Sequence, residues 1–195
     1  AIIAWYFAMR RVRPLVGLLI MNVPHPGASE RAFRRPRQLL RSWYAMFFQL
    51  PVLPERIMVA RKARAVSRAF AATACHPERF PESILDRYRT EALRPGASTG
   101  MINYYRAFFR GGGAGRQRQL GTPQIDVRTL FIWGEQDMAL TKATSEGTEA
   151  FVRDLVVRYL PDASHWVQQD APETVNAMLS AWLAGEKPPF AEAGS

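Results

Sequence analysis

The 195 residues contain a single cysteine, so no disulfide can form within the chain and a disulfide-stapled scaffold is excluded. They also lack an apolar run of about 18 residues, the length that a membrane-spanning helix needs. The longest run, at 16–23, has the length of a strand. Disorder is excluded as well, because 48% of the residues are hydrophobic and can form a core.

The charge is strongly unbalanced, with 26 Lys plus Arg against 17 Asp plus Glu and a net charge of +9. Such a surplus can indicate a nucleic-acid or membrane-surface partner. Here many arginines recur at spacings of three and four, which is typical of a solvated helix face: Arg31, Arg34, Arg35, Arg37, Arg41, Arg61, Arg64 and Arg68. No nucleic-acid-binding motif accompanies them. We therefore expect no nucleic-acid partner, no membrane span and, since no anchor is visible, a cytoplasmic location.

Hydrophobic patterning divides the chain into three parts and a tail. Residues 1–26 combine an apolar helix, Ala1–Met9, with a buried strand near 15–23, because a helix that is apolar all round is a buried one. Residues 27–121 show helical periodicity and no strand signal. Residues 122–186 return to alternating strands and helices, and 187–195 form a tail that we expect to be disordered.

Within these parts the expected elements are as follows. Four helices of the middle part lie near 39–50, 55–74, 81–93 and 98–110, with a flexible loop at 111–115. The third part has strands at 127–133 and 155–160 and helices at 141–152 and 172–183. An all-helical insert between parallel strands predicts an α/β fold with a lid over the carboxyl edge of the sheet, where such sheets bind ligands.

An acid and a histidine follow two neighbouring predicted strands. Asp137 comes after the first strand of the third part, and His165, 28 residues later, follows the second. In α/β-hydrolases the acid and the histidine of the catalytic triad occur in this order. The acid would orient the imidazole, and the histidine would act as general base. Considered singly, each residue fits a helix cap or a loop position; the pairing favours a function.

Three motifs resemble the epoxide hydrolases of the α/β-hydrolase superfamily: Gly134–Glu135–Gln136–Asp137, Ala163–Ser164–His165–Trp166 and Asn22–Val23–Pro24–His25–Pro26. The opening helix is similar to the one that follows the nucleophile in that family, and the resemblance extends to about Leu183. It implies that the chain is the C-terminal part of an α/β-hydrolase fold. Because haloalkane and haloacetate dehalogenases share these motifs, a dehalogenase-like hydrolase remains the alternative.

Lid tyrosines favour the epoxide hydrolases within this superfamily. The resemblance implies that Tyr44 and Tyr105 bind the epoxide oxygen, since a phenol with a pKa of about 10 can donate to an opening alkoxide. Tyr104 competes with Tyr105 on spacing, and core packing is the alternative explanation for Tyr44 and Tyr105. The aromatic lid predicts a small apolar substrate, and we expect contacts to it from Pro24, His25, Trp43, Phe47, Phe48, Phe108 and Trp166.

The resemblance implies two steps, and neither needs a metal or an organic cofactor. An aspartate attacks the epoxide to form an alkyl-enzyme ester, and water activated by the histidine hydrolyses the ester to a 1,2-diol. No Gly–X–Asp–X–Gly or Gly–X–Ser–X–Gly elbow occurs in the sequence. We therefore expect an N-terminally truncated fragment that is inactive alone. A non-catalytic basic module that binds an anionic partner is the remaining hypothesis.

Overall fold

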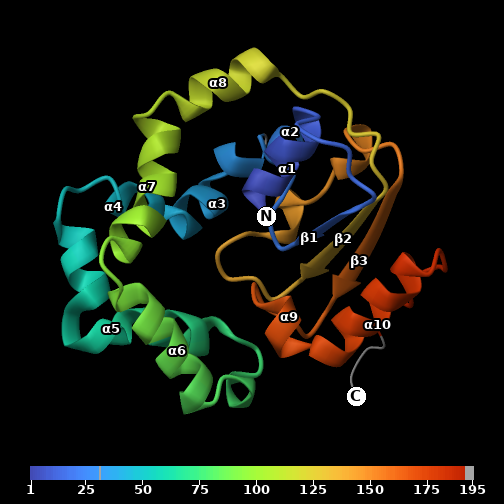
Figure 1. Cartoon of the computed structure of the whole chain (residues 1–195). Helices are drawn as coiled ribbons and strands as arrows, with labels where there is room; N and C mark the ends of the chain where they lie inside the picture. Colours follow the sequence, from blue (N-terminus) through green and yellow to red (C-terminus); the bar gives the residue numbers. More distant parts are fainter. Residues whose placement is uncertain (31, 192–195) are drawn as a thin grey trace.

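Three parallel strands run side by side in the order β1–β2–β3 (Figure 1). The computed structural model describes residues 1–30 and 32–191. Its strands are β1 (Leu18–Met21), β2 (Thr129–Gly134) and β3 (Leu155–Leu160), which lie within or beside the three predicted apolar runs. Their carboxyl ends meet at one edge, because Met21 pairs with Ile132 and Gly134 pairs with Leu160.

The central strand divides its side chains between two helical layers. Phe131 and Trp133 face α1 (Ile2–Met9), where they form one core with the buried Trp5. Leu130 and Ile132 point to the other face, which is covered by α9 (Val167–Asp170) and α10 (Pro172–Leu183). Such alternation is what a strand buried on both faces requires, and the whole of β2 is buried.

The first helix is buried on one side only. Trp5, Ala8 and Met9 pack on the sheet, whereas Ile3 is 55% exposed and Ile2 is 38% exposed. The prediction of a buried helix therefore holds for the face that packs on the sheet, and the outer face is an exposed apolar surface.

The lid consists of the elements between β1 and β2, and it arches away from the sheet in Figure 1. Its helices are α2 (Pro26–Ser29), α3 (Pro36–Arg41), α4 (Trp43–Phe47), α5 (Leu53–Thr73), α6 (Glu82–Leu93), α7 (Ala97–Phe109) and α8 (Gly113–Leu120), with 3₁₀ turns at Ala32–Arg34 and Pro77–Arg79. The predicted helices near 81–93 and 98–110 are confirmed, whereas the one predicted within 55–74 is interrupted by a kink, since residues 60–63 have non-helical backbone angles.

Two predictions within the lid were wrong. The pattern at 39–50 is broken at Ser42 into α3 and α4. The glycine run at 111–115 does not form a loop: Gly112, at φ +74°, precedes α8, which begins at Gly113. Glycine here provides the left-handed turn before a helix rather than a flexible exit from one.

The prediction of a helix at 141–152 was also wrong. Two separate 3₁₀ turns, Lys142–Thr144 and Thr148–Ala150, occupy the segment, and Gly147 at φ +83° lies between them. Side-chain hydroxyls bond to backbone carbonyls in this segment: Thr144 Oγ1 donates to Thr141 O, and Thr148 Oγ1 donates to Ser145 O. Ser and Thr side chains that bond to nearby carbonyls compete in this way with helix formation.

The expected tail is partly described. Arg158 of β3 donates through Nε to the carbonyls of Pro188 and Pro189 at 3.0 and 2.9 Å, which holds this segment against the sheet. Residues 192–195 of the predicted disordered tail lie outside the described residues. Among the residues that are described, no helix is both long and apolar enough to cross a membrane.

Candidate active site

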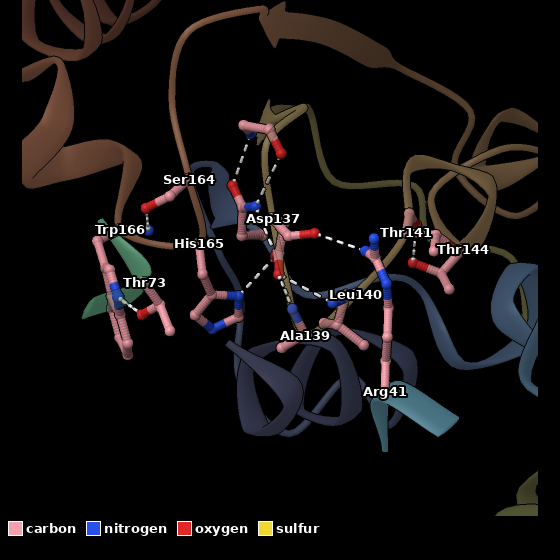
Figure 2. Close-up of polar contacts among 12 residues, drawn as sticks. Arg41, Thr73, Asp137, Ala139, Leu140, Thr141, Thr144, Ser164, His165 and Trp166 are labelled. Atoms are coloured by element: carbon pink, nitrogen blue, oxygen red, sulfur yellow. Dashed lines mark hydrogen bonds and ion pairs between the residues drawn. The ribbon is translucent and has the colours of Figure 1, made fainter. Parts of the chain in front are cut away.

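The acid and the histidine predicted from sequence are in contact. His165 Nδ1 lies 2.7 Å from Asp137 Oδ2, beyond the carboxyl ends of β3 and β2 (Figure 2). The Asp137 side chain is fully buried, and that of His165 is 27% exposed. With Nδ1 directed at the carboxylate, Nε2 is the ring nitrogen that can accept a proton from a bound molecule.

Asp137 is held by bonds to both of its carboxylate oxygens. The backbone N–H groups of Ala139 and Leu140 donate to Oδ1, each at 2.8 Å, and Asn22 Nδ2 donates to Oδ2 at 2.8 Å. Burial alone would raise the pKa of Asp137, but the bonds from His165, Asn22 and Leu140 outweigh burial and lower it. The site therefore keeps a carboxylate, rather than a carboxylic acid, behind the imidazole.

Asn22 is a site residue that sequence reasoning quoted in a motif without assigning a role. It directly follows β1, is buried, and has a left-handed backbone with φ +44°. Besides its bond to Asp137, its side chain accepts from Gly134 N–H at 2.8 Å and donates to Gly134 C=O at 3.3 Å. The signal that could have identified it is the one used for Asp137, namely a polar residue directly after a buried strand.

The loops after β2 and β3 are joined by hydrogen bonds from Gln136 to backbone carbonyls. Gln136 N–H donates to Ala163 C=O at 3.0 Å, and Gln136 Nε2 donates to Pro161 C=O at 3.0 Å. Gly134 makes this approach possible, since a Cβ there would lie 2.2 Å from the Ser164 carbonyl oxygen. The distance between acid and histidine is thus fixed by the backbone.

The two lid tyrosines lie together. The rings of Tyr44 (α4) and Tyr105 (α7) are 5.7 Å apart and perpendicular, and Phe48 packs against both. Burial, and then the charges of Tyr105 and Asp137, raise the pKa of Tyr44; burial also raises the pKa of Tyr105. Both phenols therefore stay protonated at neutral pH. Tyr104 is 60% exposed, which separates it from the pair.

The structure brings together some of the expected substrate contacts and not others. Trp166 packs edge-on against His165, and Phe48 lies beside the tyrosines. Phe47 packs against Phe48 and is half-buried. Trp43 is 65% exposed and Phe108 is 43% exposed.

His25 and Pro24 are buried, and the ring contacts of His25 are with the core rather than with the lid tyrosines. The imidazole is stacked on Phe151 at 4.8 Å and meets the edge of Trp5 at 5.1 Å. It caps α2, since its Nδ1 accepts from Gly27 N–H at 3.2 Å. Burial lowers the pKa of His25 to about 4. A fully enclosed ring cannot contact a substrate, so the expected role of His25 does not fit its position.

A metal centre finds no support in the described part of the chain, where no group of three or more His, Cys, Asp and Glu side chains could hold an ion.

The chain is similar in sequence to several curated epoxide hydrolases. Epoxide hydrolase 2 of Caenorhabditis elegans is 32% identical over 187 residues, which cover 94% of this chain and 52% of that protein. Human epoxide hydrolase 4 is 31% identical, with 94% and 51% covered. Epoxide hydrolase 3 of Xenopus tropicalis is 34% identical, with 93% and 49% covered.

Over nearly its whole length the chain is therefore similar to epoxide hydrolases of the α/β-hydrolase superfamily. It spans about half the length of the curated relatives it matches. No family model matches it. These relatives are named epoxide hydrolases, which are hydrolytic enzymes, so the prediction of an epoxide hydrolase-like chain is confirmed at that level.

Solved structures confirm the predicted fold. An inhibitor complex of the epoxide hydrolase of Bacillus megaterium has a TM-score of 0.77 at 23% identity, covering 93% of this chain and 65% of that one. A laboratory-evolved variant of potato epoxide hydrolase has a TM-score of 0.71 at 19% identity, with 94% and 66% covered. At these identities the likeness shows the α/β-hydrolase fold of the family.

Proposed function

We propose that the protein hydrolyses a small apolar epoxide to a 1,2-diol through an alkyl-enzyme ester. The observation that carries the proposal is the 2.7 Å contact between His165 and Asp137, together with a paired Tyr44 and Tyr105 whose pKa values respond to burial and, for Tyr44, to the Asp137 charge. Support also comes from the relatives, which are named epoxide hydrolases.

In the first step a carboxylate oxygen attacks an epoxide carbon, and the carbon–oxygen bond of the ring breaks. The released oxygen takes a proton from Tyr44 or Tyr105, which is later restored from solvent. Two donors aimed at a developing alkoxide stabilise it where charge appears. The attacking carboxylate is not assigned to any of these 195 residues, because they contain no Gly–X–Asp–X–Gly elbow.

In the second step His165 Nε2 removes a proton from water, and the hydroxide adds to the ester carbonyl. The acyl–oxygen bond breaks, and the departing alcohol oxygen takes the proton back from the imidazolium. Asp137 stabilises the charged ring and directs Nε2 towards the water. The Trp166 edge, Phe47 and Phe48 provide apolar surroundings, which favour an apolar substrate.

The test uses the protein encoded by the complete reading frame that contains these residues, hereafter the complete gene product. It is incubated with an aryl-substituted epoxide such as styrene oxide, and diol is measured. We expect turnover by this protein and none by the 195 residues alone. His165→Gln should block the second step, so that intact-mass measurement finds an adduct heavier by the mass of the epoxide.

Tyrosine variants separate this reaction from dehalogenation. Tyr44→Phe and Tyr105→Phe should each lower kcat by roughly 10²-fold, the cost of losing one oxyanion donor, whereas Tyr104→Phe, on the exposed side of α7, should leave it unchanged. Halide release from a haloalkane without diol formation from an epoxide would instead assign the chain to the dehalogenase-like alternative.

A further inference from the structure

Gln38 is a buried amide on an otherwise exposed helix. It is 1% exposed, whereas Pro36, Arg37, Leu39 and Leu40 of α3 are all exposed. Burying an amide costs free energy unless its hydrogen bonds are made. The position is therefore explained by what the amide contacts and not by the hydrophobic pattern of α3.

All four hydrogen-bonding positions of this amide are used. Nε2 donates to Ala139 C=O at 2.9 Å and to Ser42 Oγ at 3.1 Å. Oε1 accepts from Thr141 N–H at 3.0 Å and from Thr141 Oγ1 at 3.1 Å. A rotated amide would place its NH₂ group against the Thr141 N–H, so the partners fix its orientation.

Arg41 adds a second contact one turn later on the same helix. Its guanidinium donates to the Asp137 carbonyl at 2.8 Å (Figure 2). Residues three apart on a helix share a face, so Gln38 and Arg41 together hold the backbone of 137–141. The N–H groups of Ala139 and Leu140 bond to the Asp137 carboxylate. The Thr141 N–H group and the carbonyls of Asp137 and Ala139 bond to α3.

The same amide reaches the junction that leads to Tyr44. Ser42, whose hydroxyl accepts from Gln38, is the residue at which α3 ends and α4 begins. Tyr44 lies in the first turn of α4, two residues beyond Ser42. A displacement of α3 relative to the acid loop would therefore be passed to Tyr44 through one short turn.

We propose that Gln38, assisted by Arg41, is a positioning residue that couples the acid loop to the lid helix of Tyr44. It sets where the phenol lies relative to Asp137 and so aligns the lid donor with the histidine pair. The functional part of this inference rests on the proposed epoxide hydrolysis; the mechanical coupling does not.

The mechanical coupling is tested by hydrogen exchange with mass spectrometry on the complete gene product. Gln38→Leu should speed exchange in peptides that cover 137–141 and 43–47 together, while α6 and α10 are unchanged. Gln117→Leu is the matched control, since Gln117 is a lid-helix glutamine whose bond is to the nearby Gly121 carbonyl. Faster exchange confined to α3 would overturn the proposal.

The functional coupling is tested by a double-mutant cycle on kcat. Gln38→Leu should lower kcat by roughly 10-fold or more, since small misplacements of catalytic groups are costly. In a Tyr44→Phe background the same change should cost less than about twofold. Equal losses in both backgrounds would show that Gln38 does not act through Tyr44. Absence of turnover by the unmodified protein would refute the proposed function instead, and the exchange experiment would still decide the coupling.

Gln38→Glu provides a variant of the same shape in case Gln38→Leu does not fold. An ionised carboxylate has no proton to donate to Ala139 C=O or Ser42 Oγ, and a protonated one regains a donor. Exchange at 137–141 should therefore be faster in the variant than in the unmodified protein at pH 8. At pH 5 its rate should approach that of the unmodified protein, after correction for the intrinsic pH dependence. An effect that is independent of pH would contradict the assigned bonds.

Discussion

The loops after β2 and β3 hold their functional side chains in different ways. Asp137 is enclosed and receives bonds from the backbone of its own loop and from Asn22, while Arg41 binds its carbonyl. His165 is partly exposed, and its ring nitrogen Nδ1 is bonded to Asp137. The backbone of the histidine loop is held by a side chain: Ser164 N–H donates to the Asp170 carboxylate at 2.7 Å.

This difference suits the two roles proposed above for the acid and the histidine. A group that stabilises charge works best when it is fixed in advance, because no reorganisation is then needed during the reaction. A group that exchanges protons with water must have an open nitrogen and some room. The protein thus builds a rigid acid and attaches to it a histidine whose loop is fixed but whose ring is accessible.

The largest expected effect comes from the glycine at which both loops meet. In Gly134→Ala the new Cβ would lie 2.2 and 2.4 Å from the carbonyl oxygens of Ser164 and Ala163. Both contacts are with backbone, so the loops must separate, and we expect a loss of more than about 3 kcal/mol in the free energy of unfolding. Urea denaturation of the complete gene product measures it.

Gly100→Ala is the matched control for that experiment. Gly100 lies within α7, and a Cβ there meets no atom within 4 Å. Alanine in a helix interior is favoured over glycine by roughly 0.5–1 kcal/mol, so this variant should be slightly more stable. Similar losses in both variants would mean that the two loops are not in close contact.

The second expected effect concerns His25, a buried histidine, and it appears in how stability depends on pH. His25 is enclosed by aromatic rings, and its pKa falls from about 6.5 to about 4. The unfolded chain then binds more protons between these values, so stability is full above pH 6.5 and is lost as pH falls towards 4. The loss between pH 7 and pH 4 should be roughly 3 kcal/mol for this group.

His25→Gln isolates that contribution, because glutamine does not titrate. The unfolding free energies of both proteins are measured by urea denaturation from pH 7 to pH 4. The variant should show a smaller decrease across this range than the unmodified protein. Parallel curves would mean that His25 titrates normally in the folded state.

The Asn22→Ala variant tests how firmly Asp137 is held. Asn22→Ala leaves the Gly134 N–H group and one bond of the Asp137 carboxylate without their partner. Unpaired buried polar groups cost about 1–3 kcal/mol, and we expect a loss of about 2 kcal/mol in urea denaturation. The pKa of Asp137, measured by carboxyl-carbon NMR, should rise; an unchanged pKa would show that Asn22 does not bond to the carboxylate.

The smallest loss of stability is expected for a variant of Trp166, the residue after His165. Trp166 Nε1 donates to Thr73 Oγ1 at 2.9 Å, and its ring packs on Phe70. Trp166→Phe keeps an aromatic ring and removes the bond, so a loss of about 1 kcal/mol is expected. Trp43→Phe, at a 65% exposed position, should change stability by less than about 0.5 kcal/mol; a larger change there would contradict its exposed position.

The parts of the fold that could be predicted are those that short-range patterns determine. Continuous apolar runs marked β2 and β3, and the rule that parallel strands end at one edge brought Asp137 to His165. Gln38 could not be found in this way, because nothing in its neighbourhood on α3 shows that an amide is buried. Its four partners lie on Ser42 and on a loop about 100 residues away.

Other failures came from residues whose local options compete. The segment 141–152 has helical periodicity, but its hydroxyls bond to nearby carbonyls, and Gly147 interrupts it. His25 stands in a motif beside a strand end, as Asp137 does, yet its ring turns into the core. Whether such a side chain faces the lid or the sheet depends on packing partners such as Phe151, which is distant in sequence.

The insertion of the lid between β1 and β2 also has a consequence for folding. Asn22 and Asp137 are 115 residues apart along the chain, yet they share a hydrogen bond. Contacts of such long range form late, because the loop that they close must lose its freedom first. Lid helices that form beforehand shorten this loop. During synthesis, β1 must therefore wait for the entire lid to be made before it can meet its neighbour, and the candidate active site is among the last parts to form.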